Sequence, residues 1–137
     1  IPVVSPAVWL AIEFLRGTGS PVHRAVLRLG RDPDIELAIT EVVLMEVLAG
    51  GRGEAQAVKL GDQLTSFSML RLDPFQGYED AAAIYRAARR QGITIRKMTD
   101  CLIAVPVIKA GASLLHADTD FDRIARVAPL RIEPVGP

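Results

Sequence analysis

Residues 113–126 read SLLHADTDFDRIAR, and this stretch decides the fold that we expect. Its first four residues, 113–116, are typical of a short buried strand. An acidic turn follows, and residues 121–126 then predict a short helix. A strand that leads through acidic residues into a helix is typical of open α/β sheets, which place their ligand sites at the carboxyl ends of strands.

The same alternation of strand and helix extends through the rest of the chain. Further strands are predicted at 1–4, 35–39, 68–72 and 130–133, and helices at 5–17, 21–29, 41–48, 54–64, 75–90 and 97–109. Strands that alternate with helices favour a parallel sheet covered on both faces. We therefore expect one α/β domain over residues 1–137, a three-layer α/β/α fold with about five parallel strands.

The composition limits the class of protein. The chain has 137 residues, of which 50% are hydrophobic and 5% aromatic, and this fits an aliphatic core between helices and a parallel sheet. Its 16 basic and 16 acidic residues give a net charge of zero, so contact with nucleic acid would require a local basic patch. A single cysteine, Cys101, excludes a disulfide framework and favours the cytoplasm. Because no apolar run reaches roughly 18 residues, no membrane span is expected.

Three acidic residues lie where a strand or loop meets a helix, or inside the helix that follows. Glu46 lies in a helix of apolar residues, where a buried carboxylate needs a base, a cleft or a metal ion. Asp100 opens the most apolar helix, and Asp118 follows the strand 113–116. The acids also have structural interpretations: Glu46 as a structural or surface residue, Asp100 as a first-turn residue of its helix, and Asp120 or Asp122 as the N-cap of helix 121–126. Together the acids predict a sparse site for Mg²⁺ or Mn²⁺, ions that need few direct carboxylate ligands.

Four blocks of sequence carry a resemblance to a known family. They are VW at 8–9 with EFLRG at 13–17, TEVVLMEVL at 40–48, the segment from YR at 85–86 to TDCLIA at 99–104, and LHADTDFDRIA at 115–125. In this order and over nearly the whole length, they make the chain resemble the PIN-domain ribonucleases and, among these, the VapC toxins of bacterial toxin–antitoxin pairs.

This resemblance implies a toxin-type endoribonuclease that hydrolyses RNA with Mg²⁺ or Mn²⁺ and is inhibited by a cognate VapB-like antitoxin. It assigns Glu46, Asp100 and Asp118 as metal ligands and catalytic residues, with Asp120 as an auxiliary catalytic residue. In such a site, cations would polarise the scissile phosphate and stabilise the leaving oxygen. The family likeness also implies a homodimer and an antitoxin tail that covers the acidic cleft.

The chain departs from the family pattern near its start and inside one helix. Family members end the first strand with Asp, but counting back from Trp9 places Ser5 at that position. Anchoring the comparison on Glu13 places Ala7 there instead, so neither alignment restores the acid. Pro106 interrupts the predicted helix 97–109 and is expected to kink it near the site. The alternative function is therefore a catalytically inactive or impaired PIN-fold module that binds antitoxin or RNA without cleavage.

The densest basic segment lies immediately before Asp100. It consists of Arg86, Arg89, Arg90, Arg96 and Lys97. These cations would either contact the RNA backbone or form an exposed helix face paired with Glu79 and Asp80. Structural roles are expected for two other residues near the acids. These are His116, at the end of a buried strand, and Cys101, whose thiol lies inside an apolar helix.

Overall fold

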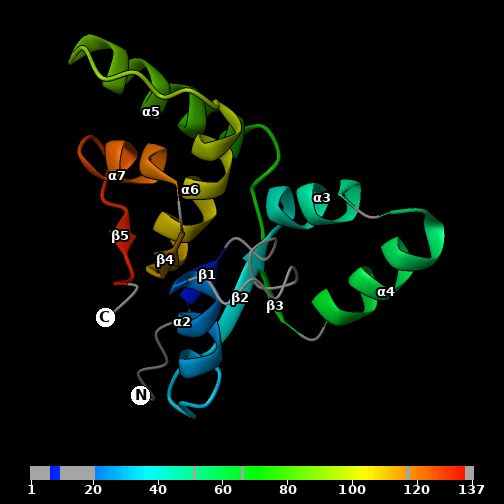
Figure 1. The fold of residues 1–137 in the computed structure, drawn as a ribbon. Helices are drawn as coiled ribbons and strands as arrows, with labels where there is room; N and C mark the ends of the chain where they lie inside the picture. The colour runs from blue at the N-terminus through cyan, green and yellow to red at the C-terminus, as the bar shows by residue number, and fades with distance from the viewer. Residues whose placement is uncertain (1–6, 10–20, 51, 66, 117, 135–137) are drawn as a thin grey trace.

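The structure, a computed structural model, describes residues 7–9, 21–50, 52–65, 67–116 and 118–134 (Figure 1), with the backbone alone at 7–9 and 21–23. Within these residues, five parallel strands form one sheet in the order β3-β2-β1-β4-β5. They are β1 (Ala7–Trp9), β2 (Leu37–Thr40), β3 (Ser68–Leu70), β4 (Ser113–Leu115) and β5 (Arg131–Ile132). The expected parallel α/β sheet is confirmed.

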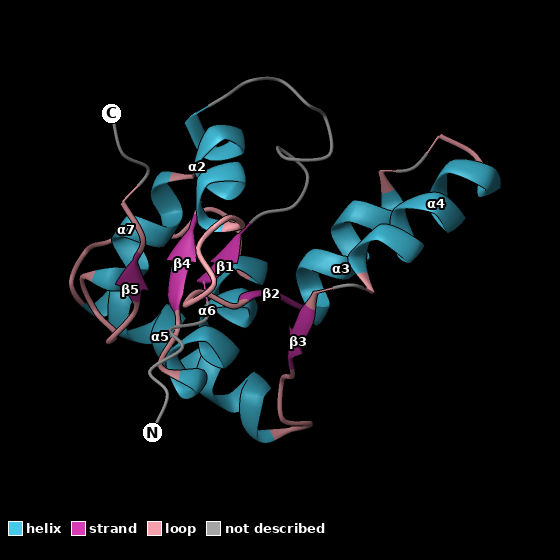
Figure 2. Cartoon of the chain, turned by 90° about the horizontal axis from the view of Figure 1, so that it is seen from below, coloured by secondary structure: helices cyan, strands magenta, loops and turns pink. Residues whose placement is uncertain are grey.

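Six described helices connect and cover these strands. They are α2 (Pro21–Leu29), α3 (Glu41–Ala49), α4 (Glu54–Leu64), α5 (Gln76–Arg90), α6 (Thr99–Ala110) and α7 (Thr119–Ala125). Figure 2 shows α2 on one side of β1 and β4, with α5 and α6 on the other side, which gives the three expected layers. Helices α3 and α4 lie next to each other on the side of the protein that is away from β5 (Figure 1).

The core between the layers is aliphatic, as the composition predicted. The largest fully buried side chains include Ile39, Leu64, Ile103, Leu114, Leu115, Ile124 and the ring of Phe121. Local signals fix the helix ends: the hydroxyl of Thr40 accepts the backbone N–H of Val43 at the start of α3, and Gly111 ends α6 in the left-handed region at a φ of 66°. In the described part of the chain, no helix combines the length and the apolar character that a membrane crossing requires.

The register of the sheet brings the carboxyl ends of three strands to one edge. Val8 of β1 pairs with Ala38 of β2 and with Leu114 of β4. Because the strand order reverses at β1, this edge is where an open α/β sheet forms its crevice. Helix α3 starts there directly after β2, and the turn that contains Asp118 starts there after β4.

The beginning of the chain differs from the expectation. Ala7–Trp9 is a strand paired with β2 and β4, so the predicted helix 5–17 is wrong at these residues. Pairing in the middle of the sheet, together with the β preference of valine and tryptophan, outweighs the tendency of a serine followed by a proline to start a helix. Ser5 itself, the predicted strand 1–4 and residues 10–20 lie outside the described residues. The carboxyl end of β1 therefore follows Trp9, and Ser5 precedes this strand in the sequence.

Two further details correct the sequence-based picture. Helix α7 begins at Thr119 with Asp118 as its N-cap, so the prediction that Asp120 or Asp122 caps it is wrong. Helix α6 contains Pro106, as predicted, but begins at Thr99, two residues later than predicted.

Candidate active site

Three carboxylates converge at the edge of the sheet described above. Asp100, Asp118 and Asp120 each offer one oxygen atom, and these atoms all lie within 4.8 Å of one another. Asp100 belongs to the first turn of α6, whereas Asp118 and Asp120 belong to the start of α7. The structure therefore brings together residues from two segments that the sequence separates by a strand.

Glu46 faces the same region from α3, without belonging to that closest group of described residues. Its Oε1 atom is buried and has no hydrogen-bond partner in the described part of the chain. Its negative charge contributes to raising the pKa of both Asp100 and Lys97. Glu46 thus adds a fourth negative charge on the α3 side of the cluster.

Asp100 is the most unusual carboxylate of the cluster. It is 4% exposed, and its Oδ2 atom has no hydrogen-bond partner among the described residues. Burial raises the pKa of Asp100 to about 7, and the charges of Asp118, Asp120 and Glu46 add to this effect, whereas Lys97 opposes it. A buried carboxylate oxygen without a partner is the arrangement that a cation would complete.

Asp118 combines a structural hydrogen bond with ion pairs to two exposed basic side chains. Its Oδ1 atom accepts the backbone N–H of Asp120 at 2.9 Å, which is the N-cap contact of α7. Its Oδ2 atom lies 3.3 Å from Nζ of Lys97, and Arg96 lies 3.6 Å from its Oδ1 atom. The Asp118 side chain is 20% exposed, so it remains accessible from solvent.

Asp120, by contrast, is fully buried and fully engaged. Its Oδ2 atom accepts the backbone N–H groups of Arg96 at 3.0 Å and Lys97 at 3.1 Å. Its Oδ1 atom accepts from Arg123 at 2.7 Å and lies 3.5 Å from Nε of Arg96. Burial alone would raise the pKa of Asp120, but these hydrogen bonds and the charge of Arg96 outweigh it and lower the pKa. Asp120 therefore anchors the segment before α6 onto α7.

His116 contacts the backbone of Asp118. Its Nδ1 atom accepts the backbone N–H of Asp118 at 3.1 Å, and its ring packs against Phe121 with 5.1 Å between ring centroids. Its Nε2 atom lies 3.2 Å from Oδ1 of Asp122. These contacts agree with the structural role predicted for His116.

The five basic residues predicted to form one RNA-contacting segment fall into two groups. Arg86, Arg89 and Arg90 are exposed on α5, where the guanidinium of Arg89 lies 6.0 Å from the ring centroid of Tyr85. Arg96 and Lys97 instead lie over the acidic cluster and pair with its carboxylates. No local pattern in the sequence indicates this second arrangement, since it depends on the fold of the loop before α6.

Two other residues lie against the carboxylates. Cys101 is fully buried, and burial raises the pKa of its thiol to about 11, with the charges of Asp100 and Asp120 adding to the effect. A thiol that stays protonated is a poor nucleophile, which agrees with the structural role predicted for Cys101. Arg123 was not among the predicted site residues, although its spacing of three residues from Asp120 on a helix is a recognised signal for an ion pair.

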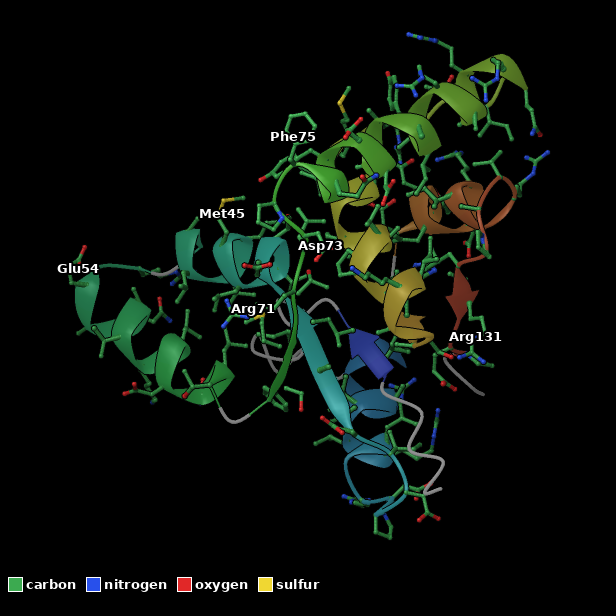
Figure 3. All side chains as sticks on the ribbon, turned by 180° about the vertical axis from the view of Figure 1, so that it is seen from behind. Met45, Glu54, Arg71, Asp73, Phe75 and Arg131 are labelled. Atoms are coloured by element: carbon green, nitrogen blue, oxygen red, sulfur yellow. The ribbon has the colours of Figure 1, made fainter. Side chains whose placement is uncertain are left out.

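An apolar groove lies beside the cluster. It is lined mainly by Val42, Met45, Leu72, Tyr78, Thr99 and Leu102. Met45 is 58% exposed and Phe75 78% exposed, and both project away from the ribbon in Figure 3. Phe75 has a φ of 66°, and the tight turn that it forms is closed by the N–H of Gln76 donating to the Pro74 carbonyl at 2.8 Å. Thr99, which lines this groove, immediately precedes Asp100 in the sequence.

The donor set fits a hard divalent cation. Carboxylate oxygens are the ligands that Mg²⁺ and Mn²⁺ prefer in proteins, and such ions keep several waters. Asp100 has a buried oxygen free to bind, Glu46 has another buried oxygen without a described partner, and the partly exposed side chain of Asp118 has an Oδ2 atom that, among the described residues, pairs only with the exposed side chain of Lys97. Asp120 fits less well as a direct ligand because both its oxygens already accept hydrogen bonds.

Comparison with known proteins gives consistent results. The PIN domain family model matches residues 8–127. The chain is 36% identical over 129 residues to VapC ribonuclease Mb1587 of Mycobacterium bovis and to ribonuclease VapC11 of Mycobacterium tuberculosis, covering 94% of this chain and 95% of each relative. Among solved structures, VapBC-1 of nontypeable Haemophilus influenzae matches with a TM-score of 0.71 at 18% identity, covering 96% of this chain and 98% of that one. VapBC-5 of Mycobacterium tuberculosis matches with a TM-score of 0.66 at 19% identity, covering 93% and 97%. The structural likenesses, at these identities, establish the fold.

Proposed function

The chain belongs to the PIN-domain family, with VapC ribonucleases as relatives along nearly its full length, and from this premise we propose that it is a toxin-type endoribonuclease dependent on Mg²⁺ or Mn²⁺. The observation that supports metal dependence is the buried, unpartnered Oδ2 atom of Asp100 within a group of carboxylates. We also propose that residues 1–137 form a single domain and act in the cytoplasm.

Each acidic residue takes a distinct part in this proposal. Asp100 and Asp118 would hold the cation directly, and Glu46 would complete the ligand set from α3. Asp120 would act as a positioning residue, since it fixes the backbone of Arg96 and Lys97. When bound, Mg²⁺ or Mn²⁺ supplies Lewis-acid activation of the phosphate and of water. In the hydrolysis, the oxygen of a water molecule forms a bond to phosphorus while one P–O bond to ribose breaks, and the leaving oxygen takes that electron pair and gains a proton.

The partners of the proposed enzyme are RNA and an antitoxin. The exposed arginines of α5 would contact RNA phosphates. A VapB-like antitoxin would place an apolar segment in the groove that contains Met45 and Tyr78, because a methionine-containing apolar groove suits an amphipathic helix. A homodimer, in which two acidic clefts lie close together, also belongs to this proposal.

The experiment that tests the proposal combines metal binding with RNA cleavage. Asp100→Asn preserves the shape of the side chain but removes its charge, so it should weaken Mn²⁺ binding by about tenfold to a hundredfold and abolish cleavage. Asp80→Asn, an exposed change on α5, is the matched control and should alter neither property. Cleavage of RNA that persists in the presence of a strong chelator would contradict metal dependence.

A second candidate function is the inactive or impaired module that binds antitoxin or RNA. The observation that favours it is that Arg96 and Lys97 already supply positive charge to Asp118 and Asp120 without any metal. Calorimetric titration with Mn²⁺ separates the two candidates, since a module that only binds need not retain a cation.

A further inference from the structure

Lys97 lies at the mouth of the acidic cluster. Its Nζ atom is 3.3 Å from Oδ2 of Asp118, and its side chain is 59% exposed. The ammonium therefore stands between solvent, from which a substrate would arrive, and the carboxylates beneath it. As a lysine ammonium open to solvent, it is cationic at neutral pH.

The backbone of Lys97 is held on both sides. Its N–H donates to Oδ2 of Asp120 at 3.1 Å, and its carbonyl accepts the N–H of Asp100 at 3.0 Å. Asp120 is itself fully buried and bonded to Arg123. The base of the side chain is therefore fixed, while the exposed stem lets Nζ move over a short distance without any rearrangement of the fold.

The charges around the acidic cluster indicate how many metal ions it can bind. Four carboxylates, those of Glu46, Asp100, Asp118 and Asp120, lie near three basic side chains: Lys97, Arg96 and Arg123. With every group ionised the net charge is minus one, so a single divalent cation already outweighs it and a second ion would meet a positively charged site. Several carboxylates at such short range would otherwise repel each other strongly enough to favour a second ion.

We propose that Lys97 takes the place of a second cation, so that the cluster binds one divalent ion and the Lys97 ammonium contacts a non-bridging oxygen of the scissile phosphate. Lysine binds phosphate as a point charge, and no directional fork is required of it. The phosphate contact makes Lys97 a catalytic residue and rests on the proposed ribonuclease function. The competition between Lys97 and the metal ion for Asp118 does not rest on that function.

The first test measures Mn²⁺ binding by titration calorimetry in the full chain. Lys97→Met removes the charge but keeps the stem, Lys97→Arg keeps the charge, and Lys59→Met is a matched change on an exposed face of α4. The native chain should bind one ion. Lys97→Met should bind Mn²⁺ about tenfold more tightly because Asp118 loses its competing cation, whereas the other two variants should match the native affinity. Two ions bound to the native chain, or unchanged or weaker binding by Lys97→Met, would overturn the proposal.

The second test measures single-turnover cleavage of a short labelled RNA of random sequence at saturating Mn²⁺. Lys97→Met should cleave about a hundredfold more slowly despite its tighter metal binding, and Lys97→Arg should recover most of the rate. An unchanged rate in Lys97→Met would overturn the phosphate contact. If the native chain cleaves nothing, the proposed function fails, and RNA binding measured by anisotropy in Ca²⁺ then decides the Lys97 contact: weaker binding by Lys97→Met supports it, and equal binding overturns it.

Discussion

The Nδ1 atom of His116 accepts the backbone N–H of Asp118 at 3.1 Å, so a buried imidazole fixes the main chain of an accessible carboxylate. This contact implies the tautomer that carries its proton on Nε2, the atom that lies 3.2 Å from Asp122. His116 thereby fixes the main chain from which the Asp118 carboxylate extends.

Replacing His116 should damage both stability and metal binding. His116→Phe keeps a ring against Phe121 but leaves the Asp118 N–H without its acceptor, which should lower the free energy of unfolding by about 1–3 kcal/mol. Urea denaturation measures this loss, and Mn²⁺ titration should show weaker binding. Asp122→Asn, which changes only the exposed carboxylate near Nε2 of His116, an atom without a hydrogen-bond partner in the described structure, should leave both values nearly unchanged, and equal losses in the two variants would contradict this account.

Asp120 should prove more important for stability than any other member of the cluster. Asp120→Asn retains the shape but loses the charge that attracts Arg96 and Arg123, and we expect a loss of about 2–4 kcal/mol in unfolding free energy. Asp100→Asn should be neutral or stabilising, since it removes a buried charge without a hydrogen-bond partner on Oδ2 in the described structure. Chemical denaturation of the metal-free variants measures both changes, and the reverse order would exclude the anchoring role of Asp120.

Metal binding should release a proton below neutral pH. In the metal-free protein Asp100 has a pKa of about 7, raised from 3.8 chiefly by burial. Between these values the folded protein binds more protons than the unfolded chain, so the contribution of Asp100 to stability falls as pH rises through this window. A cation requires the ionised carboxylate, and Mn²⁺ affinity should therefore fall about tenfold per pH unit below about pH 7. Calorimetry near pH 6 in two buffers of different ionisation enthalpy should detect about one released proton, and Asp100→Asn should abolish this release.

The arginines of α5 should affect RNA binding without affecting the metal. Replacing Arg86, Arg89 and Arg90 with Gln should weaken RNA binding and reduce its salt dependence by about 0.7 in the logarithmic slope for each phosphate that is no longer neutralised. Anisotropy titrations over a range of salt concentrations measure that slope. Mn²⁺ affinity should stay at the native value, and an unchanged salt slope would show that this face of α5 does not contact RNA.

Local sequence signals predicted most of the elements. Helix α4 was predicted over its observed range, Glu54–Leu64, and α3 was predicted from its observed start at Glu41, because capping residues and glycines act on their neighbours. The first strand could not be placed in this way. Its residues Ala7–Trp9 follow a serine and a proline that favour a helix start, and only pairing with two distant strands makes them extended.

The candidate site was predicted to a similar extent. The sequence indicated that Asp100 and Asp118 would share a site, because each lies where a helix starts at one edge of a parallel sheet. Binding of Asp120 to the backbone N–H groups of residues 96 and 97 could not be foreseen, since those groups lie more than twenty residues away and carry no side-chain signature. For the same reason Lys97 was grouped with the arginines of α5 instead of with the acids.

The double engagement of Asp120 also bears on how descendants of this chain would diverge. A lineage that gave up cutting RNA would still require Asp120 to hold the loop before α6 onto α7, so the persistence of this aspartate says little about activity. The Oδ2 atom of Asp100 has no hydrogen-bond partner among the described residues. A lineage that no longer bound a metal ion would therefore gain stability by replacing Asp100. In a set of related sequences, the retention of Asp100 would therefore indicate retained catalytic activity better than the retention of Asp120.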